Sequence, residues 1–210
     1  MLKRFNISSN SIVALALSLF FTASGVCLLV IANVGSDAVT MFCSGLSRYF
    51  DISLGAASNF TNIGVLVVAL LVGRKYIGFT TIATCLLMGV VINLLNPIYI
   101  GLVAPLTENI FISYVIFLFG LLSESFGCAI LIHYQTGMNQ LDALATGLVD
   151  TFNLKYPLVR TLMDVCLFLF GFIMGAKIGV GTLICVLTMG TIINCCVKVM
   201  NSYHAKQQGY

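Results

Sequence analysis

The sequence predicts an all-α polytopic membrane protein with six transmembrane helices in two inverted three-helix repeats, each carrying a short re-entrant or interfacial half-helix. Three observations predict this fold: the composition, the number of long apolar windows and an internal duplication. Of the 210 residues, 60% are hydrophobic and only 8% are charged, which is typical of an integral membrane protein. The net charge of +3 is too small to indicate nucleic-acid binding.

A bilayer-spanning helix needs about 20 predominantly apolar residues. Six windows of the chain are apolar and long enough to qualify: 11–32, 54–72, 79–95, 110–132, 158–174 and 180–199. Lys3 and Arg4 precede the first window, as basic residues precede the core of a signal peptide. This window is longer than such a core and has a counterpart in the second half of the chain, so we interpret it as a retained first helix.

The two halves of the chain resemble each other. At one constant spacing, Gly35, Gly45, Phe50 and Gly73 recur as Gly137, Gly147, Phe152 and Gly175. After a slip of a single residue, Met88-Gly89 and Ile92-Asn93 recur as Met189-Gly190 and Ile193-Asn194. Duplication of an apolar chain is typical of transporter architectures built from repeats. Because each copy holds three spans, the two copies are expected to have opposite orientations in the membrane.

Between the first and second spans of each repeat lies a shorter segment, at 36–50 and at 138–152. Each is too short to cross comfortably, and each follows a polar, glycine-containing break, at 33–37 and at 135–140. Non-helical backbone at membrane depth is tolerated where protein covers it or where it lines a wet cavity. We therefore predict two half-helices whose breaks mark a binding site. Two amphipathic surface helices joined by turns are the alternative.

The distribution of Lys and Arg predicts the orientation. If the short segments do not cross, eight basic residues lie on one side: Lys3, Arg4, Arg74, Lys75, Lys155, Arg160, Lys198 and Lys206. Only Arg48 and Lys177 lie on the other, so the positive-inside rule places both termini in the cytoplasm. If both segments crossed, the distribution would be seven against three. The predicted organisation is a cytoplasmic N-terminus (1–10), a first membrane repeat (11–96), an extracytoplasmic connecting loop (97–109), a second membrane repeat (110–199) and a cytoplasmic tail (200–210).

Polar side chains at membrane depth need a partner or water, so they indicate candidate sites. The expected substrate-binding residues are Asn33, Asp37, Asn59, Asn62, Glu124, Gln135, Asn139, Asp142, Arg160 and Asp164. Glu124 is the most central acid, and we interpret it as a proton-coupling or substrate-binding group, or else as a protonated packing group. Arg160 and Asp164 share a helix face, so Arg160 either grips an anionic group of the solute or is neutralised by Asp164.

Other polar residues favour structural roles. Asn93 and Asn194 end the repeated motif and are expected to bond neighbouring helices. The eight cysteines have no metal-ligand spacing, which favours packing. Phosphate-binding, dinucleotide-binding and hydrolase motifs are missing from the sequence, so we expect no enzymatic activity, no cofactor and no metal.

Short glycine-based motifs resemble those of the bacterial YczE/YitT-like integral membrane proteins. They include Ala32-Asn33-Val34-Gly35, Gly73-Arg74-Lys75 and Ile77-Gly78-Phe79-Thr80-Thr81, with a second copy at Ile178-Gly179-Val180-Gly181-Thr182. That family's pattern places an acidic residue five positions after the break glycine. Asp142 matches it, whereas the first repeat has Thr40 there and Asp37 nearby. The resemblance implies a multi-pass protein of the bacterial cytoplasmic membrane with a transport-related role.

Two functions follow as expectations. The first is a secondary transporter or permease of a small polar or anionic solute, with its site at the interface of two inverted repeats and a coupling proton or cation. The second is a non-transporting membrane partner or regulatory protein. Besides the lipid bilayer, a second copy of the chain or another membrane protein is an expected partner.

Overall fold

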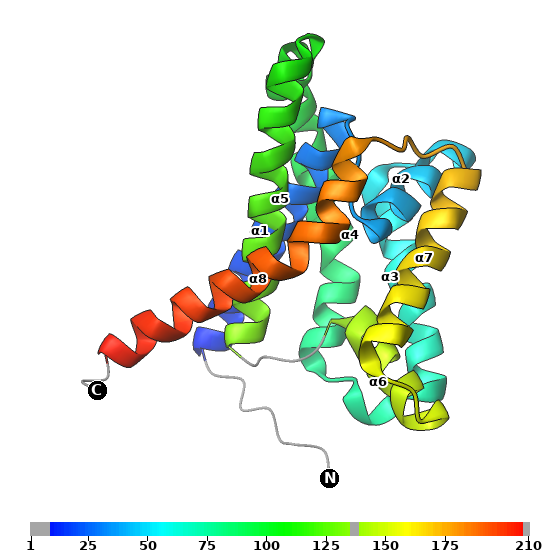
Figure 1. Cartoon of the computed structure of the whole chain (residues 1–210), viewed down its shortest axis with the longest axis vertical. Coiled ribbons are helices and arrows are strands. Elements are labelled where there is room, and N and C mark those ends of the chain that lie inside the picture. Colours follow the sequence, from blue (N-terminus) through cyan, green and yellow to red (C-terminus); the bar gives the residue numbers. More distant parts are fainter. Residues whose placement is uncertain (1–8, 135–138, 208–210) are drawn as a thin grey trace.

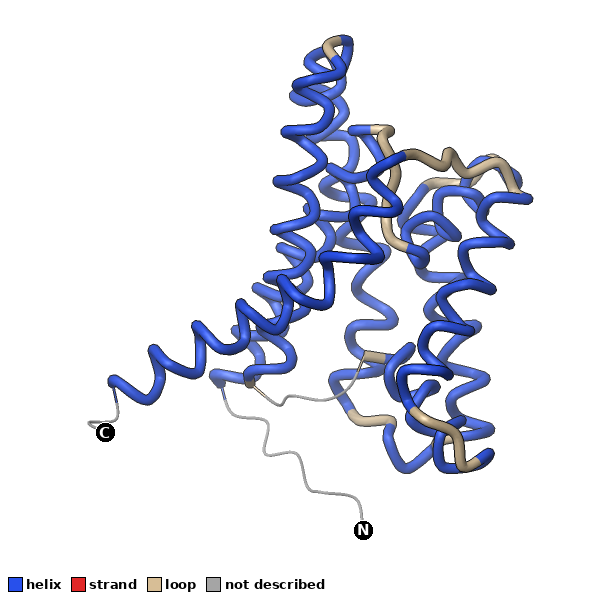
Figure 2. The backbone as a smooth tube through the Cα atoms, viewed as in Figure 1, coloured by secondary structure: helices blue, strands red, loops and turns tan. Residues whose placement is uncertain are grey.

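The computed structural model describes residues 9–134 and 139–207, and within these ranges it is all-helical, without strands. The short predicted segments are both helices, and helices lie over all six apolar windows (Figures 1 and 2). The elements in chain order are α1 (Ser9–Ala32), α2 (Ala38–Phe50), α3 (Leu54–Val72), η1 (Arg74–Tyr76), α4 (Phe79–Val103), η2 (Ala104–Glu108), α5 (Ile110–His133), α6 (Gln140–Phe152), α7 (Tyr156–Ile173) and α8 (Val180–Gln207).

Among the described residues, five stretches are long and apolar enough to cross a membrane, where six are predicted from the sequence. They are Ile12–Ala32, Leu54–Val72, Thr80–Glu108, Ile110–His133 and Val180–Ser202. α7 is not among them; it has 18 residues and carries Arg160 and Asp164. The helices are therefore compatible with a multi-pass membrane protein. It has six spans if α7 crosses the membrane and five if it does not.

The segment 97–109 differs from the loop that the sequence predicts. α4 passes through Pro97 and ends at Val103, and η2 continues the helical path to Glu108. A proline removes one backbone hydrogen bond, but apolar helices of membrane proteins tolerate it where the freed carbonyl finds another partner. The apolar residues that follow Pro97 thus extend the helix. α8 likewise continues past residue 199 to Gln207.

Equivalent helices of the two halves run in opposite directions in Figure 1. There, α1, α4 and α7 run from the lower to the upper end of the molecule, and α3, α5 and α8 run back. α1 and α5, the equivalent first helices, form the most extensive helix pair. The short helices cross between the halves, because α2 packs on α7 and α6 packs on α3. The short helix of each half therefore packs on the second long helix of the other half.

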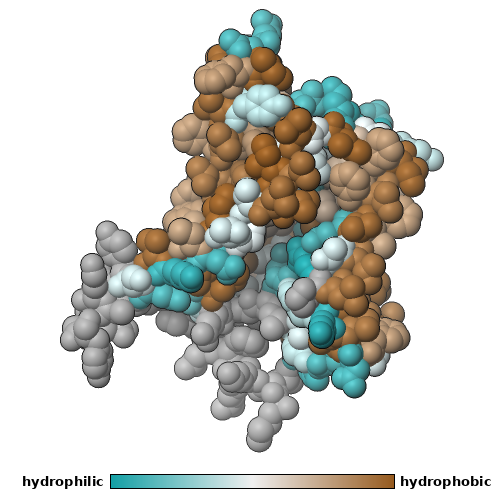
Figure 3. Space-filling model, viewed as in Figure 1, coloured by the Kyte–Doolittle hydropathy of each residue, from teal (hydrophilic) through white to brown (hydrophobic). Residues whose placement is uncertain are grey.

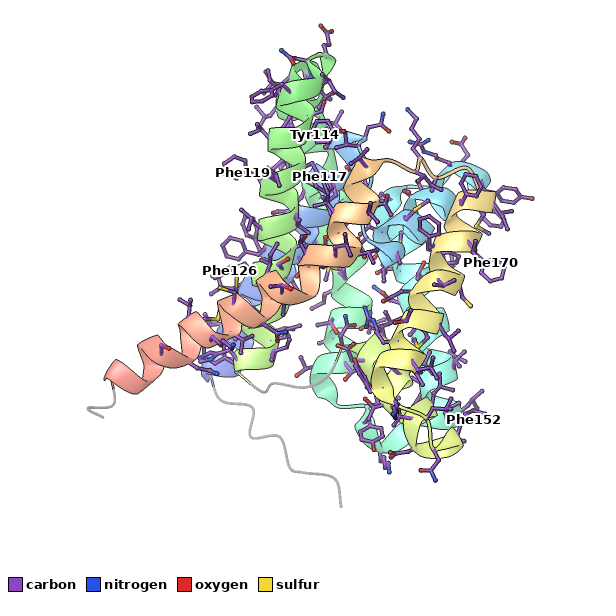
Figure 4. The ribbon with its side chains drawn as sticks, viewed as in Figure 1. Tyr114, Phe117, Phe119, Phe126, Phe152 and Phe170 are labelled. Atoms are coloured by element: carbon purple, nitrogen blue, oxygen red, sulfur yellow. The ribbon has the colours of Figure 1, made fainter. Side chains whose placement is uncertain are left out.

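Small residues allow these helices to approach closely. A Cβ atom added at Gly25 would lie 2.5 Å from Glu124 Cβ, and one added at Gly127 would lie 2.3 Å from Thr22 Oγ1. Ser18 Oγ donates to the Gly127 carbonyl at 2.8 Å across the same α1–α5 interface. The other side of α5 packs on α8 through Phe117, which lies between these helices in Figure 4, whereas Phe119 points outward.

The two halves differ in how their last two helices pack. α3 and α4 are joined by reciprocal hydrogen bonds: the Gly55 amide donates to Asn93 Oδ1 at 3.1 Å, and the Gly89 amide donates to Asn59 Oδ1 at 3.0 Å. For Asn93 this matches the predicted packing role. In the second half, α7 and α8 form no comparable interface over their described residues, and a Cβ added at Gly190 would meet open space.

Replacing Gly127 by Ala should destabilise the protein, because its Cβ would clash with both the side chain and the backbone of Thr22. Overpacking of this kind costs about 1–3 kcal/mol. The apparent Tm of the purified protein in detergent measures the effect. Gly64→Ala is the matched control, since a Cβ at Gly64 meets nothing within 4 Å. Equal Tm values for the two variants would contradict the close α1–α5 packing.

Candidate functional site

An arginine lies between two carboxylates where α6 meets α7. We call the set Asp142, Tyr156, Arg160 and Asp164 the arginine cluster. Arg160 Nη1 lies 2.6 Å from Asp142 Oδ1, and Arg160 Nε lies 3.1 Å from Asp164 Oδ2. The Tyr156 hydroxyl donates to the same Asp142 oxygen at 3.0 Å. The Arg160 guanidinium thus forms ion pairs with two half-buried carboxylates. With Arg160, Asp142 and Asp164 ionised, the cluster has a net charge that is negative.

Local sequence explains this geometry. Asp142 lies in the first turn of α6, where the positive end of the helix dipole favours a carboxylate. Asn153 ends α6 in the left-handed conformation (φ 55°), and the chain turns at once into α7. Arg160 and Asp164 then lie four residues apart on one face of α7. The predicted pairing of Arg160 with Asp164 is present, and Asp142 is an additional partner.

The first repeat contains a neutral version of the same arrangement. By the spacing of the duplication, Ser58 and Asn62 on α3 are equivalent to Arg160 and Asp164 on α7. Asn62 Nδ2 donates to Ser58 Oγ at 3.5 Å, and both residues are buried. The i,i+4 contact is therefore kept in both halves, but only the second half is charged.

A second polar site surrounds the first helix break. We call Asp37 and Glu124 the buried acid pair. Asp37 caps α2, with its Oδ2 accepting from the amides of Val39 at 3.1 Å and Thr40 at 3.3 Å. Its buried Oδ1 has no partner among the described residues, and the same is true of Glu124 Oε2. The two carboxylates are near enough to interact electrostatically.

The backbone of the break is built around left-handed residues. Asn33 has φ 57° and Gly35 has φ 127°, a conformation that glycine adopts without strain. A Cβ at Gly35 would lie 2.4 Å from the Thr182 amide nitrogen, and the Gly181 amide donates to the Val34 carbonyl at 2.9 Å. The start of α8 therefore packs directly on the break, which enters the bundle between α1 and α2 in Figure 2.

The second break has a matching neighbour at the start of α4. Thr84 Oγ1 on α4 donates to Gln140 Oε1 at the start of α6, at 3.4 Å. Gln140 was not predicted as a site residue, although the recurrence of Thr81 as Thr182 in the duplicated motifs points to the helix starts. Gln140, at the described end of the second break, thus lies beside the start of α4, as the first break lies beside the start of α8. Gln135 lies outside the described residues.

The remaining predicted residues lie elsewhere. Asn33 and Asn139 are exposed, and Asn139 begins α6 without a side-chain capping bond. Asn59 is engaged in the α3–α4 interface through Gly89. The structure therefore brings together Asp142, Arg160 and Asp164 at one site and Asp37 and Glu124 at another. Asp37 is also close enough to Asp164 to interact with it electrostatically, so the two sites are near each other.

A surface ion pair joins the halves at the end of α6. Lys75 Nζ lies 2.6 Å from Asp150 Oδ2, and the Tyr76 hydroxyl donates to the same carboxylate. The hydrogen bond from Lys75, followed by that from Tyr76, lowers the pKa of Asp150, and the pKa of Lys75 is raised mainly by the same bond. Because the pair is exposed, its contribution to stability is small and salt-sensitive.

An all-helical fold with five candidate spans among the described residues is compatible with a multi-pass membrane protein. The chain belongs to DUF6198, a family of unknown function, whose sequence pattern matches residues 9–198. It is similar to an uncharacterized protein of Haemophilus influenzae, with 27% identity over 183 residues that cover 87% of this chain and 80% of the relative. No solved structure matches it. Neither description uses the YczE/YitT name, so that resemblance stays a prediction.

Replacing Arg160 by Gln should destabilise the protein more than replacing Asp164 by Asn. The first change leaves two carboxylates facing each other, whereas the second leaves the Arg160–Asp142 pair intact. The loss for Arg160→Gln should exceed the ~1 kcal/mol of an exposed ion pair. Apparent Tm values in detergent measure this order, with the exposed Asp51→Asn as control. If the triple variant with Asp142→Asn and Asp164→Asn were no more stable than Arg160→Gln alone, charge compensation would not be the cause.

Proposed function

We propose that the protein is a secondary transporter of a small polar solute, with its site at the interface of two inverted repeats. The observation that carries this proposal is the pair of polar sites, each next to a short helix inside an otherwise apolar bundle. Discontinuous helices that meet at a repeat interface are how many secondary transporters build a binding site near the bilayer midplane. In this proposal the arginine cluster and the buried acid pair are the polar groups that such an interface contributes.

In this proposal α7 is the sixth span. The opposite directions of equivalent helices and the packing of α7 against α2 support it. Arg160 and Asp164 neutralise each other in part, which reduces the cost of charges inside the bilayer. η1 and the start of α7, with their basic residues, lie at the same end of the molecule as the start of α1 and the end of α8 (Figure 1). The positive-inside rule then puts both termini in the cytoplasm and the protein in the bacterial cell membrane.

The charges narrow the class of solute. Arg160 is already paired with two carboxylates, so it offers little free positive charge to an anion. Asp37 and Glu124 add two further acids close to this cluster. This balance favours a neutral or cationic polar solute over the anionic one that Arg160 alone suggests.

The unequal packing of the last two helices supports alternating access. α3 and α4 are held together by hydrogen bonds between asparagine side chains and glycine amides, whereas α8 diverges from α7 (Figure 1). Polar side chains gather in the indentation between α8 and the α6–α7 side in Figure 3, where the hydrophobic surface is interrupted. We infer that this side is open in the present conformation and that α8 closes on α7 in another.

The alternative is a non-transporting membrane partner or regulatory protein. The end of α8 that projects away from the bundle in Figure 1 favours it, because a second membrane protein or another copy of the chain can pack there. In that case the polar sites only organise helix packing. Untargeted metabolite profiling of deletion and overexpression strains separates the two functions, since only a transporter changes the distribution of a solute between cell and medium.

Asp142→Asn should abolish the solute change that the wild-type gene restores in a deletion strain. The variant removes the negative charge of one of the two carboxylates on Arg160 and keeps an oxygen that accepts from Tyr156. Asp51→Asn, at an exposed turn, should restore the change fully. Metabolite profiling at equal protein levels measures both. Full complementation by Asp142→Asn together with failure of Asp51→Asn would place the site elsewhere.

Closure of α8 on α7 can be tested by disulfide cross-linking. Thr161 and Gly190 are the repeat equivalents of Asn59 and Gly89, which touch in the first half. In a background with the eight cysteines replaced, Thr161→Cys with Gly190→Cys should cross-link in membranes under oxidation, in proportion to the closed state. In a background that keeps only Cys43, Thr61→Cys gives the control pair, because Cys43 Sγ lies 3.5 Å from Thr61 Oγ1. Cross-linking of the control pair without any of the α7–α8 pair would contradict closure.

A further inference from the structure

Five buried side-chain atoms have no hydrogen-bond partner among the described residues, and all five are oxygens. They are Ser24 Oγ, Asp37 Oδ1, Glu124 Oε2, Ser125 Oγ and Thr182 Oγ1. Burying a polar group without a hydrogen-bond partner costs a transfer free energy of about 2–7 kcal/mol. A cluster of such atoms therefore indicates a ligand that supplies what the protein does not.

The five atoms come from both halves of the chain, and each belongs to a residue within five positions of a member of one buried cluster, which contains Leu29, Val34, Leu121 and Cys185. The Cα of Gly25, next to Ser24, approaches Glu124 so closely that an added Cβ would lie 2.5 Å from Glu124 Cβ. An added Cβ at Gly35 would lie 2.6 Å from Thr182 Oγ1. Cys185, one turn after Thr182, interacts electrostatically with both Asp37 and Glu124. α1, the break, α5 and the start of α8 thus surround one spot.

Positive charge from the protein is missing at this spot. The ion pairs of the described residues involve Lys75 and Arg160, and neither Asp37 nor Glu124 takes part in one. The amides of Val39 and Thr40 reach only Asp37 Oδ2. Glu124 is only 5% exposed, so bulk water does not compensate its charge either.

The donor set selects the kind of ligand. Carboxylate and hydroxyl oxygens are hard ligands that suit alkali and alkaline-earth cations rather than soft metals. Within the described residues there is no group of three or more His, Cys, Asp or Glu arranged to hold a metal ion. Two ionised carboxylates carry two negative charges, so one monovalent ion and one proton shared by the two carboxyl groups balance the site. In transporters built from repeats, unwound backbone beside a broken helix adds carbonyl ligands for such ions.

We propose that Asp37 and Glu124, with the hydroxyls of Ser24, Ser125 and Thr182, bind one small monovalent cation such as Na⁺ at the first helix break. The bound cation joins α1 and α5 to the start of α8. Its occupancy therefore stabilises the position of the helix that diverges from α7. As the coupling ion of a carrier, this role rests on the proposed transport function, whereas the binding itself does not.

The experiment uses the purified full-length protein in lipid nanodiscs. Binding of ²²Na⁺ is measured by scintillation proximity. The Tm is measured in NaCl and, at equal ionic strength, in N-methyl-D-glucamine chloride. A ligand that binds only the folded state raises the Tm with its concentration. We expect saturable binding of ²²Na⁺ and a Tm that rises with NaCl. Asp37→Asn and Glu124→Gln should weaken binding by at least about tenfold, as for loss of a charged ligand.

Asp51→Asn, an exposed acid, is the matched control and should bind like the wild type. If the acid variants do not fold, Thr182→Val and Ser125→Ala, which keep both carboxylates, should still weaken binding of ²²Na⁺. Identical Tm values in the two salts with no ²²Na⁺ binding would overturn the proposal, as would stabilisation by CaCl₂ alone. Na⁺ binding without any solute flux would defeat the transport function and leave this site standing, whereas solute flux without Na⁺ binding would do the reverse.

Discussion

The structure depends on one constraint: inside a bilayer no water satisfies polar groups, so the protein has to do so itself. Helices meet this requirement for the backbone, and glycines allow them to approach closely enough for serine and asparagine side chains to bond the neighbouring backbone. Ser18 with Gly127 and Asn59 with Gly89 are instances on different interfaces. Where the chain leaves the helix, at Asn33 to Asp37, another helix start must come close, and α8 does so through Gly181. The polar sites therefore follow from the breaks.

The two halves share the positions at which their short helices begin and end, but they differ in where their charged residues lie. Asp37 and Asn139 begin the two short helices, and Asp51 and Asn153 end them with nearly equal φ angles of 52° and 55°. The same positions on α3 and α7 carry Ser58 and Asn62 in one half and Arg160 and Asp164 in the other. One half thus keeps an acid at its break and neutral groups on its long helix, and the other half has the charges on α6 and α7. The result is an excess of acidic side chains, together with an α8 that does not pack on α7 over the described residues.

Much of the fold was predictable because apolar length and glycine spacing are local properties of the sequence. The six windows and both short segments are helical, and Arg160 with Asp164 could be paired from helical spacing alone. The extension of α4 past Pro97 was not predictable, since a proline in an apolar helix only weakens it. The Asp142–Arg160 contact, the orphaned oxygens of Ser24 and Thr182 and the unequal packing of α7 and α8 depend on how helices cross, which the sequence pattern does not encode. Whether α7 spans the membrane stays a prediction.

In the proposed topology the two copies have opposite orientations in the membrane. Asp51 and Asn153 occupy the same turn of each copy, both exposed, so inverted repeats place them on opposite faces of the membrane. In a cysteine-free background, Asp51→Cys and Asn153→Cys can be labelled in cells with a membrane-impermeant thiol reagent before and after permeabilisation. Inverted repeats predict labelling of Asp51→Cys in intact cells and of Asn153→Cys only after permeabilisation. Labelling of both positions from the same side would contradict it.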